Sequence, residues 1–251
     1  MKIVMTDLAK LMVERMTKSE RDQSFPDTEP RDAATLILID RSGKEPKVLL
    51  GRRHRDHKFM PDKFVFPGGR IEPQDRTMSA ANELHADAEA KLMARVKEPS
   101  KELARAFALA AIRETCEETG LLLGVKSGAP LAVSGDLWQP FAQAGVYPDL
   151  SQLHFVARAI TPPRRPKRFD SRFFTADASA IAHRIEGVVS PTSELVELVW
   201  APVSEATKLD LPTITAVVLE ELAARVKAGM EHRLPVPMYF MKDDVFHREL
   251  L

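Results

Sequence analysis

Three glutamates lie close together in the chain at a spacing that can hold a metal ion. Glu114, Glu117 and Glu118 stand at positions i, i+3 and i+4, so a helix places all three carboxylates on one face. Like charges at this spacing repel, and they precede Gly120, a typical helix end, where the helix dipole disfavours anions. A divalent cation offsets both effects, because hard cations bind clustered carboxylate oxygens. The spacing therefore favours a metal site over the simpler alternative, a solvated acidic face.

Two neighbouring features strengthen the metal interpretation. Arg113 directly precedes Glu114 and can hold a carboxylate in a fixed geometry. Upstream, residues 66–70 read Phe-Pro-Gly-Gly-Arg, a turn whose glycines let the backbone approach a ligand closely. The arginine, the glutamates and the glycine turn together form a stronger signal than any of them alone.

These residues resemble the signature of the Nudix hydrolases, which reads G-x5-E-x7-R-E-U-x-E-E-x-G-U, with U an apolar residue. Gly69 matches the first glycine, Asp75 stands at the first glutamate, and Thr115 replaces an apolar residue. The second half matches without gaps at Arg113, Glu114, Glu117, Glu118, Gly120 and Leu121. Thirty-seven residues, 76–112, separate the two halves where the family has seven, so we expect an insertion within the motif.

The resemblance implies an α/β fold, the Nudix-type α/β/α sandwich with a mixed sheet, here carrying an inserted helical segment. It implies a hydrolase acting on acid anhydrides, with Mg²⁺ or Mn²⁺ as cofactor. The metal would be held by Glu114, Glu117, Glu118 and the carbonyl of Gly69. The expected catalytic residues are Glu114, Arg113 and Glu117. Asp75 and Glu194 are further candidates for a metal ligand or base.

Two basic stretches accompany the motif. The first contains Arg52, Arg53, His54, Arg55, His57 and Lys58, and the second contains Arg164, Arg165, Lys167, Arg168 and Arg172. Taken alone, either stretch is typical of a solvated loop. The first leads directly into the glycine turn, which favours phosphate binding. We expect Arg53, Arg70 and Arg168 to bind the substrate.

The same region is similar to a submotif of Nudix enzymes that cleave coenzyme A, L-L-T-x-R-S-x3-R-x3-G-x3-F-P-G-G. Leu49, Leu50, Arg53 and residues 66–69 match it, and the sequence departs from it at Gly51, His54, Lys58 and Asp62. Residues 59–62 and 168–174 resemble the acyl-coenzyme A diphosphatase branch, which also carries an insertion. The expected partner is a small-molecule nucleotide-diphosphate substrate, coenzyme A or acyl-coenzyme A. ADP-ribose or another nucleotide sugar is an alternative, and so is a Nudix-fold sensor or regulator that binds a nucleotide without turnover.

Periodicity and turn residues predict the elements that position these side chains. Strands are expected at residues 33–39, 47–51, 64–66, 153–160, 171–174 and 194–199, and helices at 6–17, 79–96, 101–119 and 213–227. We expect an N-terminal extension (1–30), a Nudix hydrolase domain (31–229) with its helical insertion around 76–100, and a C-terminal tail (230–251). The insertion helix is expected beside the mouth of the active site, with the two halves of the motif adjacent in space.

Composition narrows the remaining possibilities. Lys plus Arg equals Asp plus Glu at 36 each, so no global field favours nucleic acid or a membrane as partner. No apolar run approaches the roughly 20 residues of a membrane span, and no signal peptide is recognised. The single cysteine, Cys116, fits a reducing compartment, so a cytoplasmic location is expected. A homodimer is left open as the oligomeric state.

Overall fold

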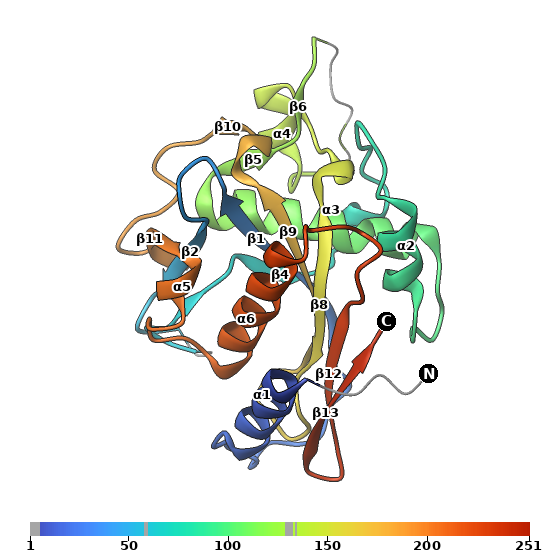
Figure 1. Cartoon of the computed structure of the whole chain (residues 1–251). Coiled ribbons are helices and arrows are strands. Elements are labelled where there is room, and N and C mark those ends of the chain that lie inside the picture. Colours follow the sequence, from blue (N-terminus) through green and yellow to red (C-terminus); the bar gives the residue numbers. More distant parts are fainter. Residues whose placement is uncertain (1–5, 58–59, 129–132, 134) are drawn as a thin grey trace.

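The computed structural model describes residues 6–57, 60–128, 133 and 135–251 (Figure 1). Its helices are α1 (Asp7–Lys18), α2 (Ala86–Met93), α3 (Lys101–Thr119), α4 (Gln139–Ala144), α5 (Val203–Ala206) and α6 (Thr213–Lys227). Its strands are β1 (Arg31–Asp40), β2 (Lys47–Arg53), β3 (Phe64–Val65), β4 (Gly68–Arg70), β5 (Leu121–Leu123), β6 (Val125–Lys126), β7 (Val146–Tyr147), β8 (His154–Ile160), β9 (Phe169–Asp177), β10 (Ile181–Arg184), β11 (Leu195–Pro202), β12 (Pro237–Lys242) and β13 (Val245–Leu250). Of the earlier predictions, those that concern Lys58 and Phe59 lie outside the described residues.

A nine-stranded mixed sheet forms the centre of the molecule. Its strand order is β11-β2-β1-β9-β8-β12-β13, with β3 paired to β2 and β4 paired to β1. The pairs β1–β9 and β8–β12 are parallel, and the other pairs are antiparallel. β1 pairs with β2 only at their hairpin end, at Ile39–Val48 and Asp40–Lys47. Farther along, β4 pairs with β1 in place of β2, and this divergence brings the glycine turn into the sheet.

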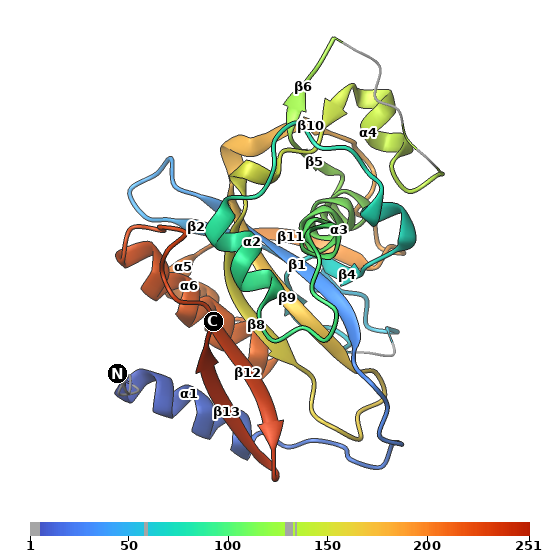
Figure 2. The same ribbon diagram turned by 90° about the vertical axis from the view of Figure 1, so that its right-hand side faces the viewer.

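The two faces of the sheet are covered by different helices, as the alternation along β1 requires. Leu36 and Leu38 belong to one core cluster with residues of α3, whereas Ile37 and Ile39 belong to another with residues of α6 and α1. Figure 2 shows the sheet between α3 on one side and α6 with α1 on the other. The predicted α/β/α sandwich with a mixed sheet is therefore confirmed.

The inserted segment contains a shorter helix than expected, and this helix does not lie beside the active-site mouth. The helix predicted over residues 79–96 is only α2 (Ala86–Met93), because the chain before it is extended: the N–H of Ala81 donates to the carbonyl of Pro148 at 2.8 Å, and Asn82 forms a bridge with Asp149. The helix ends before Arg95, whose φ of 56° is left-handed. α2 packs against α3 and β8 (Figure 1), and none of its residues lines the cleft that contains the glutamates, so the prediction that it flanks the active-site mouth is wrong.

Both ends of the chain add to the sandwich. The segment from 230 to 251 was expected only as a tail, but β12 joins β8 in parallel and turns back into β13 at Asp243 and Asp244, which have φ of 51° and 59°. The expected N-terminal helix is present as α1 and packs against β13 and α6. None of the helices in the described ranges is both long and apolar enough to cross a bilayer.

A column of three histidines ties the insertion to the sheet. The His232 ring stacks between His85, which caps α2, and His154 on β8, with centroids 4.2 and 4.1 Å apart. Burial, together with the neighbouring His232, Arg225, Arg41 and His85, lowers the pKa of His154 to about 4. The Nδ1 atoms of His154 and His232 are buried and have no hydrogen-bond partner among the residues that the structure describes, so the column is suited to neutral rings.

The column predicts sensitivity of the fold to acid. A histidine whose pKa is lower in the folded state stabilises the fold above its unfolded pKa of about 6.5, and this stabilisation is lost as the pH falls toward about 4. Between pH 7 and pH 5 the unfolding free energy of the wild type should fall by about 1–2 kcal/mol more than that of His154→Phe. Urea denaturation at the two pH values measures this. His247→Phe, a change at an exposed histidine of β13, should follow the wild type, and equal losses in all three proteins would contradict the prediction.

Candidate active site

Helix α3 carries the glutamates, and its ends are fixed by local chemistry. The Ser100 side chain accepts a hydrogen bond from the N–H of Leu103 at 3.1 Å, and Gly120 ends the helix with φ of 74°. The N–H of Gly120 donates to the Cys116 carbonyl at 2.8 Å, and a Cβ at position 120 would lie 2.2 Å from the Ile185 carbonyl oxygen. Only glycine therefore fits at this end, which sets the position of the last helical turn.

Arg113 is the centre of a buried hydrogen-bond network. Its Nη1 donates to Glu114 at 2.8 Å and to both carboxylate oxygens of Glu117 at 3.1 Å. Its Nη2 donates to the Arg70 carbonyl at 2.8 Å, which links α3 to the end of β4. Burial works to lower the pKa of Arg113, but the hydrogen bond to Asp75 and the surrounding carboxylates raise it above its ordinary value. The guanidinium therefore stays charged and holds two of the predicted metal-binding glutamates in place.

The carboxylate of Asp75 forms a buried ion pair with Arg113. It is 0% exposed and accepts hydrogen bonds from Arg113 Nε at 2.9 Å and Nη2 at 3.0 Å. It also accepts a hydrogen bond from the N–H of Glu72 at 2.8 Å. Asp75 therefore braces Arg113, and this geometry does not support the expectation that it serves as a metal ligand or base.

The glycine turn lies directly against the glutamates despite the insertion. A Cβ on Gly69 would lie 2.5 Å from the carboxylate of Glu114, and a Cβ on Gly68 would lie 2.6 Å from the Ala34 carbonyl oxygen. The backbone contact requires glycine at position 68, whereas a side chain at position 69 would displace the Glu114 carboxylate. The expectation that the two halves of the motif are adjacent in space is confirmed.

The carboxylates at the end of α3 are crowded. Burial and the charge of Glu117 raise the pKa of Glu114 and Arg113 lowers it, and the net result is a pKa of about 7. Burial also raises the pKa of Glu118 well above its ordinary value, and Glu194 and Glu114 raise it further. The charged forms of these groups are thus unfavourable in the protein alone, and a divalent cation would offset this.

This donor set fits a hard divalent cation, although it is not a closed metal site. Among the residues that the structure describes, no three His, Cys, Asp or Glu side chains already have the arrangement of a metal centre. Glu114 and Glu117 face Arg113 instead. The fit rests on the oxygen chemistry of Glu114, Glu117 and Glu118, and on the repulsion that Glu194 and Glu114 exert on Glu118.

Glu114, Glu117 and Glu118 line a cleft of about 770 Å³. The predicted site residues that line it are Arg53, Gly69, Arg70, Arg113, Glu114, Glu117, Glu118 and Glu194. Asp136 also lines it, and no motif in the sequence indicated this residue. A volume in this range is typical of small-molecule sites.

Arg53 and Glu194 also line the cleft, and both act electrostatically on Glu118. Arg53 Nη2 donates to Glu194 and lies 2.9 Å from Nε2 of His57, and Glu194 lies 3.4 Å from the same ring nitrogen. Arg53 Nε is buried and has no hydrogen-bond partner in the described part of the chain. A guanidinium with a free buried donor beside carboxylates is suited to a substrate anion.

Arg168 lies outside this cleft. Its Nη1 pairs with Asp27 at 2.6 Å and donates to the Thr28 carbonyl, which ties the N-terminal extension to the loop between β8 and β9. The adjacent Lys167 lines the cleft instead. Both residues lie just before β9, in a stretch of the chain without regular structure, so sequence spacing alone could not decide which of the two faces the site.

The comparisons with known proteins agree with this geometry. The chain is similar to the crystal structure of a NUDIX hydrolase from Alicyclobacillus acidocaldarius, with 32% identity and a TM-score of 0.60 over 78% of this chain and 92% of that one. It is also 26% identical over 156 residues to "Putative nudix hydrolase 7" of Caenorhabditis elegans, a match of 57% of this chain and 43% of that protein. The chain thus spans less than half of that relative's length. No family model matches the sequence. The identity and coverage of the bacterial relative show that the chain belongs to the Nudix hydrolase family.

Proposed function

We propose that the protein is a Mg²⁺- or Mn²⁺-dependent hydrolase that cleaves the diphosphate bond of a nucleoside diphosphate linked to another moiety. The observation that carries this proposal is the group of Glu114, Glu118 and Glu194 at the cleft, whose mutual repulsion favours a bound cation. Arg53 and Arg70 line the same cleft and give it the positive charge that phosphates require. Membership of the Nudix hydrolase family supports the same reaction class.

The residues of the chain have separate tasks in this proposal. Glu114, Glu117, Glu118 and the carbonyl of Gly69 would hold the metal, which neutralises phosphate charge and lowers the pKa of water. Either Glu114 or Glu117, the two carboxylates that Arg113 holds, accepts the proton of the attacking water. Water adds to one phosphorus and the bridging P–O bond breaks, so the products are two phosphate monoesters.

The test is product release by the purified protein. A panel of nucleoside diphosphate derivatives is incubated with Mg²⁺, with Mn²⁺ and with EDTA, and the phosphate monoester products are quantified. Turnover that depends on the metal supports the proposal. Tight binding of a nucleotide without turnover under every condition would instead identify a sensor built on the same fold.

We propose coenzyme A and its acyl derivatives as the substrate class, and this proposal predicts a ranking of substrates by kcat/KM. The partial submotif at Leu49, Leu50 and Arg53 favours it, and coenzyme A carries a 3′-phosphate that ADP-ribose lacks. Coenzyme A or an acyl-coenzyme A should be cleaved with a kcat/KM at least about tenfold above that of ADP-ribose or a nucleoside triphosphate, since one charge-assisted hydrogen bond contributes about 1.5 kcal/mol or more. A higher kcat/KM for ADP-ribose would reject this substrate and leave the diphosphatase proposal intact.

A further inference from the structure

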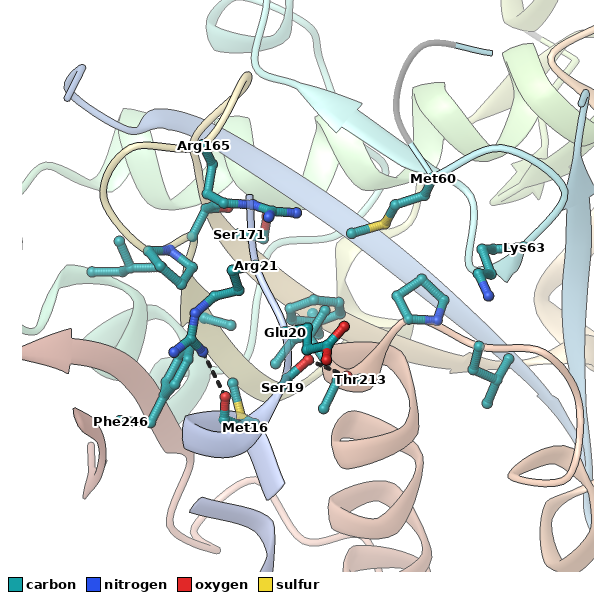
Figure 3. Close-up of a pocket in the computed structure, with 18 residues that line it drawn as sticks. Met16, Ser19, Glu20, Arg21, Met60, Lys63, Arg165, Ser171, Thr213 and Phe246 are labelled. Atoms are coloured by element: carbon teal, nitrogen blue, oxygen red, sulfur yellow. Dashed lines mark hydrogen bonds between the residues drawn. The ribbon is translucent and has the colours of Figure 1, made fainter. Parts of the chain in front are cut away.

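A second cavity of about 450 Å³ adjoins the catalytic cleft (Figure 3). Its walls come from the end of α1 and the segment after it, the loop between β2 and β3, the loop between β8 and β9, the start of α6, and β13. The residues that line both spaces are Met60, Thr161, Ser171, Phe173 and Ile214. A ligand in the cleft can therefore extend into this cavity.

Most of the cavity wall is apolar. Met16, Phe173 and Phe246 are buried side chains that line it, and Leu211 and Ile214 at the start of α6 complete this surface. A concave apolar surface with a few polar groups is typical of sites for ring-containing small molecules. The size and lining fit a nucleoside rather than a bare ion.

Two arginines lie on one side of the cavity. Figure 3 shows Arg165, from the loop between β8 and β9, and Arg21 on the side opposite Met60 and Lys63. Arg21 donates to the Met16 carbonyl at 2.7 Å, and its guanidinium lies 5.6 Å from the centroid of the Phe246 ring. Among the described residues, Arg165 donates only to the Asp22 carbonyl, at 3.3 Å. Both side chains are thus held by backbone oxygens.

The carboxylates that act on this pair, Asp244 on Arg21 and Asp22 on Arg165, do so from beyond ion-pair distance. Within the described ranges, neither Arg21 nor Arg165 has an ion pair, and Nε of Arg21 is buried without a hydrogen-bond partner. Burial lowers the pKa of Arg21, and the charge of Arg165 lowers it further, which shows that the two guanidiniums repel each other. The other cation of the cavity, Lys63, is paired with Asp210 at 2.5 Å. Glu20 also lines the cavity, but it is exposed and makes no ion pair with either arginine.

We propose that this cavity binds the part of the substrate beyond the diphosphate, and that Arg21 and Arg165 bind a phosphomonoester carried on it. A phosphate dianion offers three oxygens to two guanidiniums and removes their repulsion. The ring system that carries the phosphate lies against Phe246 and the other apolar residues. This inference rests on the proposed cleavage of a nucleoside diphosphate derivative, and it narrows the substrate to one with an additional phosphate.

The first experiment measures binding by calorimetry in the presence of Mg²⁺. The probes are adenosine 3′,5′-bisphosphate and AMP, which differ by one phosphomonoester and contain no diphosphate bond. The wild type should bind the bisphosphate at least about tenfold more tightly than AMP, equivalent to about 1.4 kcal/mol. Arg165→Met should abolish this difference and leave AMP binding unchanged. Arg164→Met removes the same charge from the exposed neighbouring position and should bind both probes as the wild type does.

Several outcomes would overturn the proposal. Equal affinity of the wild type for the two probes, an equal loss for AMP in Arg165→Met, or the same loss in Arg164→Met would each contradict it. Arg165 makes one hydrogen bond, so its replacement should leave the melting temperature unchanged. Arg21 also holds the end of α1, so the Arg165 variant is the decisive one.

A second experiment separates this inference from the proposed function. Hydrolysis of coenzyme A and of 3′-dephospho-coenzyme A is compared in the wild type and in Arg165→Met. A KM that rises about tenfold or more for coenzyme A alone, with kcat unchanged, supports both proposals. Hydrolysis of both compounds with the same KM in both proteins retains the function and rejects the phosphate subsite. If neither compound is hydrolysed while bisphosphate binding still depends on Arg165, the proposed function fails and the subsite stands.

Discussion

Glu118→Gln is expected to lower kcat with Mg²⁺ at least about a thousandfold, which corresponds to about 4 kcal/mol of lost transition-state stabilisation. The amide keeps the shape of the side chain but no longer supplies a charged oxygen to a metal. Steady-state kinetics at saturating Mg²⁺ measure the loss, and metal titration by calorimetry should show weaker binding. A variant that turns over substrate at the wild-type rate would remove Glu118 from the metal site.

The same variant should not be less stable than the wild type. Burial, Glu194 and Glu114 all raise the pKa of Glu118, so its charged form is unfavourable in the metal-free fold. Replacing it by a neutral isostere removes that repulsion, and the melting temperature without metal should equal or exceed that of the wild type. Glu205→Gln, a change at an exposed residue of α5, should leave both activity and stability unchanged. A lower melting temperature for Glu118→Gln would point to a structural role instead.

Asp75→Ala is expected to destabilise the fold by about 3 kcal/mol and to impair catalysis as well. The side chains of Asp75 and Arg113 are 0% and 2% exposed, so the change leaves a buried guanidinium without its main partner. Arg113 then no longer fixes Glu114, and kcat/KM should fall by roughly a hundredfold. Urea denaturation and kinetics measure the two effects separately.

Glu83→Ala is the matched control for this prediction. Glu83 forms an ion pair with Arg105, but its side chain is 60% exposed. Exposed pairs contribute about 1 kcal/mol or less, so this variant should remain close to the wild type in both assays. If Asp75→Ala lost no more stability than Glu83→Ala, the assignment of Asp75 as the brace of Arg113 would be wrong.

The long helices could be predicted from sequence because their ends carry local signals. α3 begins after Ser100 and ends before Gly120, and α6 follows Pro212, so both match the expected ranges of 101–119 and 213–227. The buried strands were also recognisable, since their apolar runs are flanked by turn residues. Glu114, Glu117 and Glu118 all line the cleft, because the spacing on a helix determines which residues share a face.

Tertiary contacts decided the features that sequence reasoning missed. Residues before Ala86 have helical composition, but the pairing of Asn82 with Asp149 holds them extended. Asp75 occupies the position of a family glutamate, and only its burial against Arg113 reveals its role. The hairpin of β12 and β13 did have a local signal, the Asp243-Asp244 turn between alternating segments, which could have been recognised.

The insertion shows that the motif depends on the spatial arrangement of its residues, and that the number of residues between its two halves can vary. Asp75 and Arg113 meet across thirty-seven residues, and lengthening this loop from seven residues adds only about 1.5 kcal/mol of closure entropy. Burial of Leu92 on α2 contributes a similar amount in return, about 2 kcal/mol. The chain thus has a loop at which residues can be added or removed while the reacting groups keep their positions. Such a loop lets related enzymes acquire new surfaces without a change in their catalytic residues.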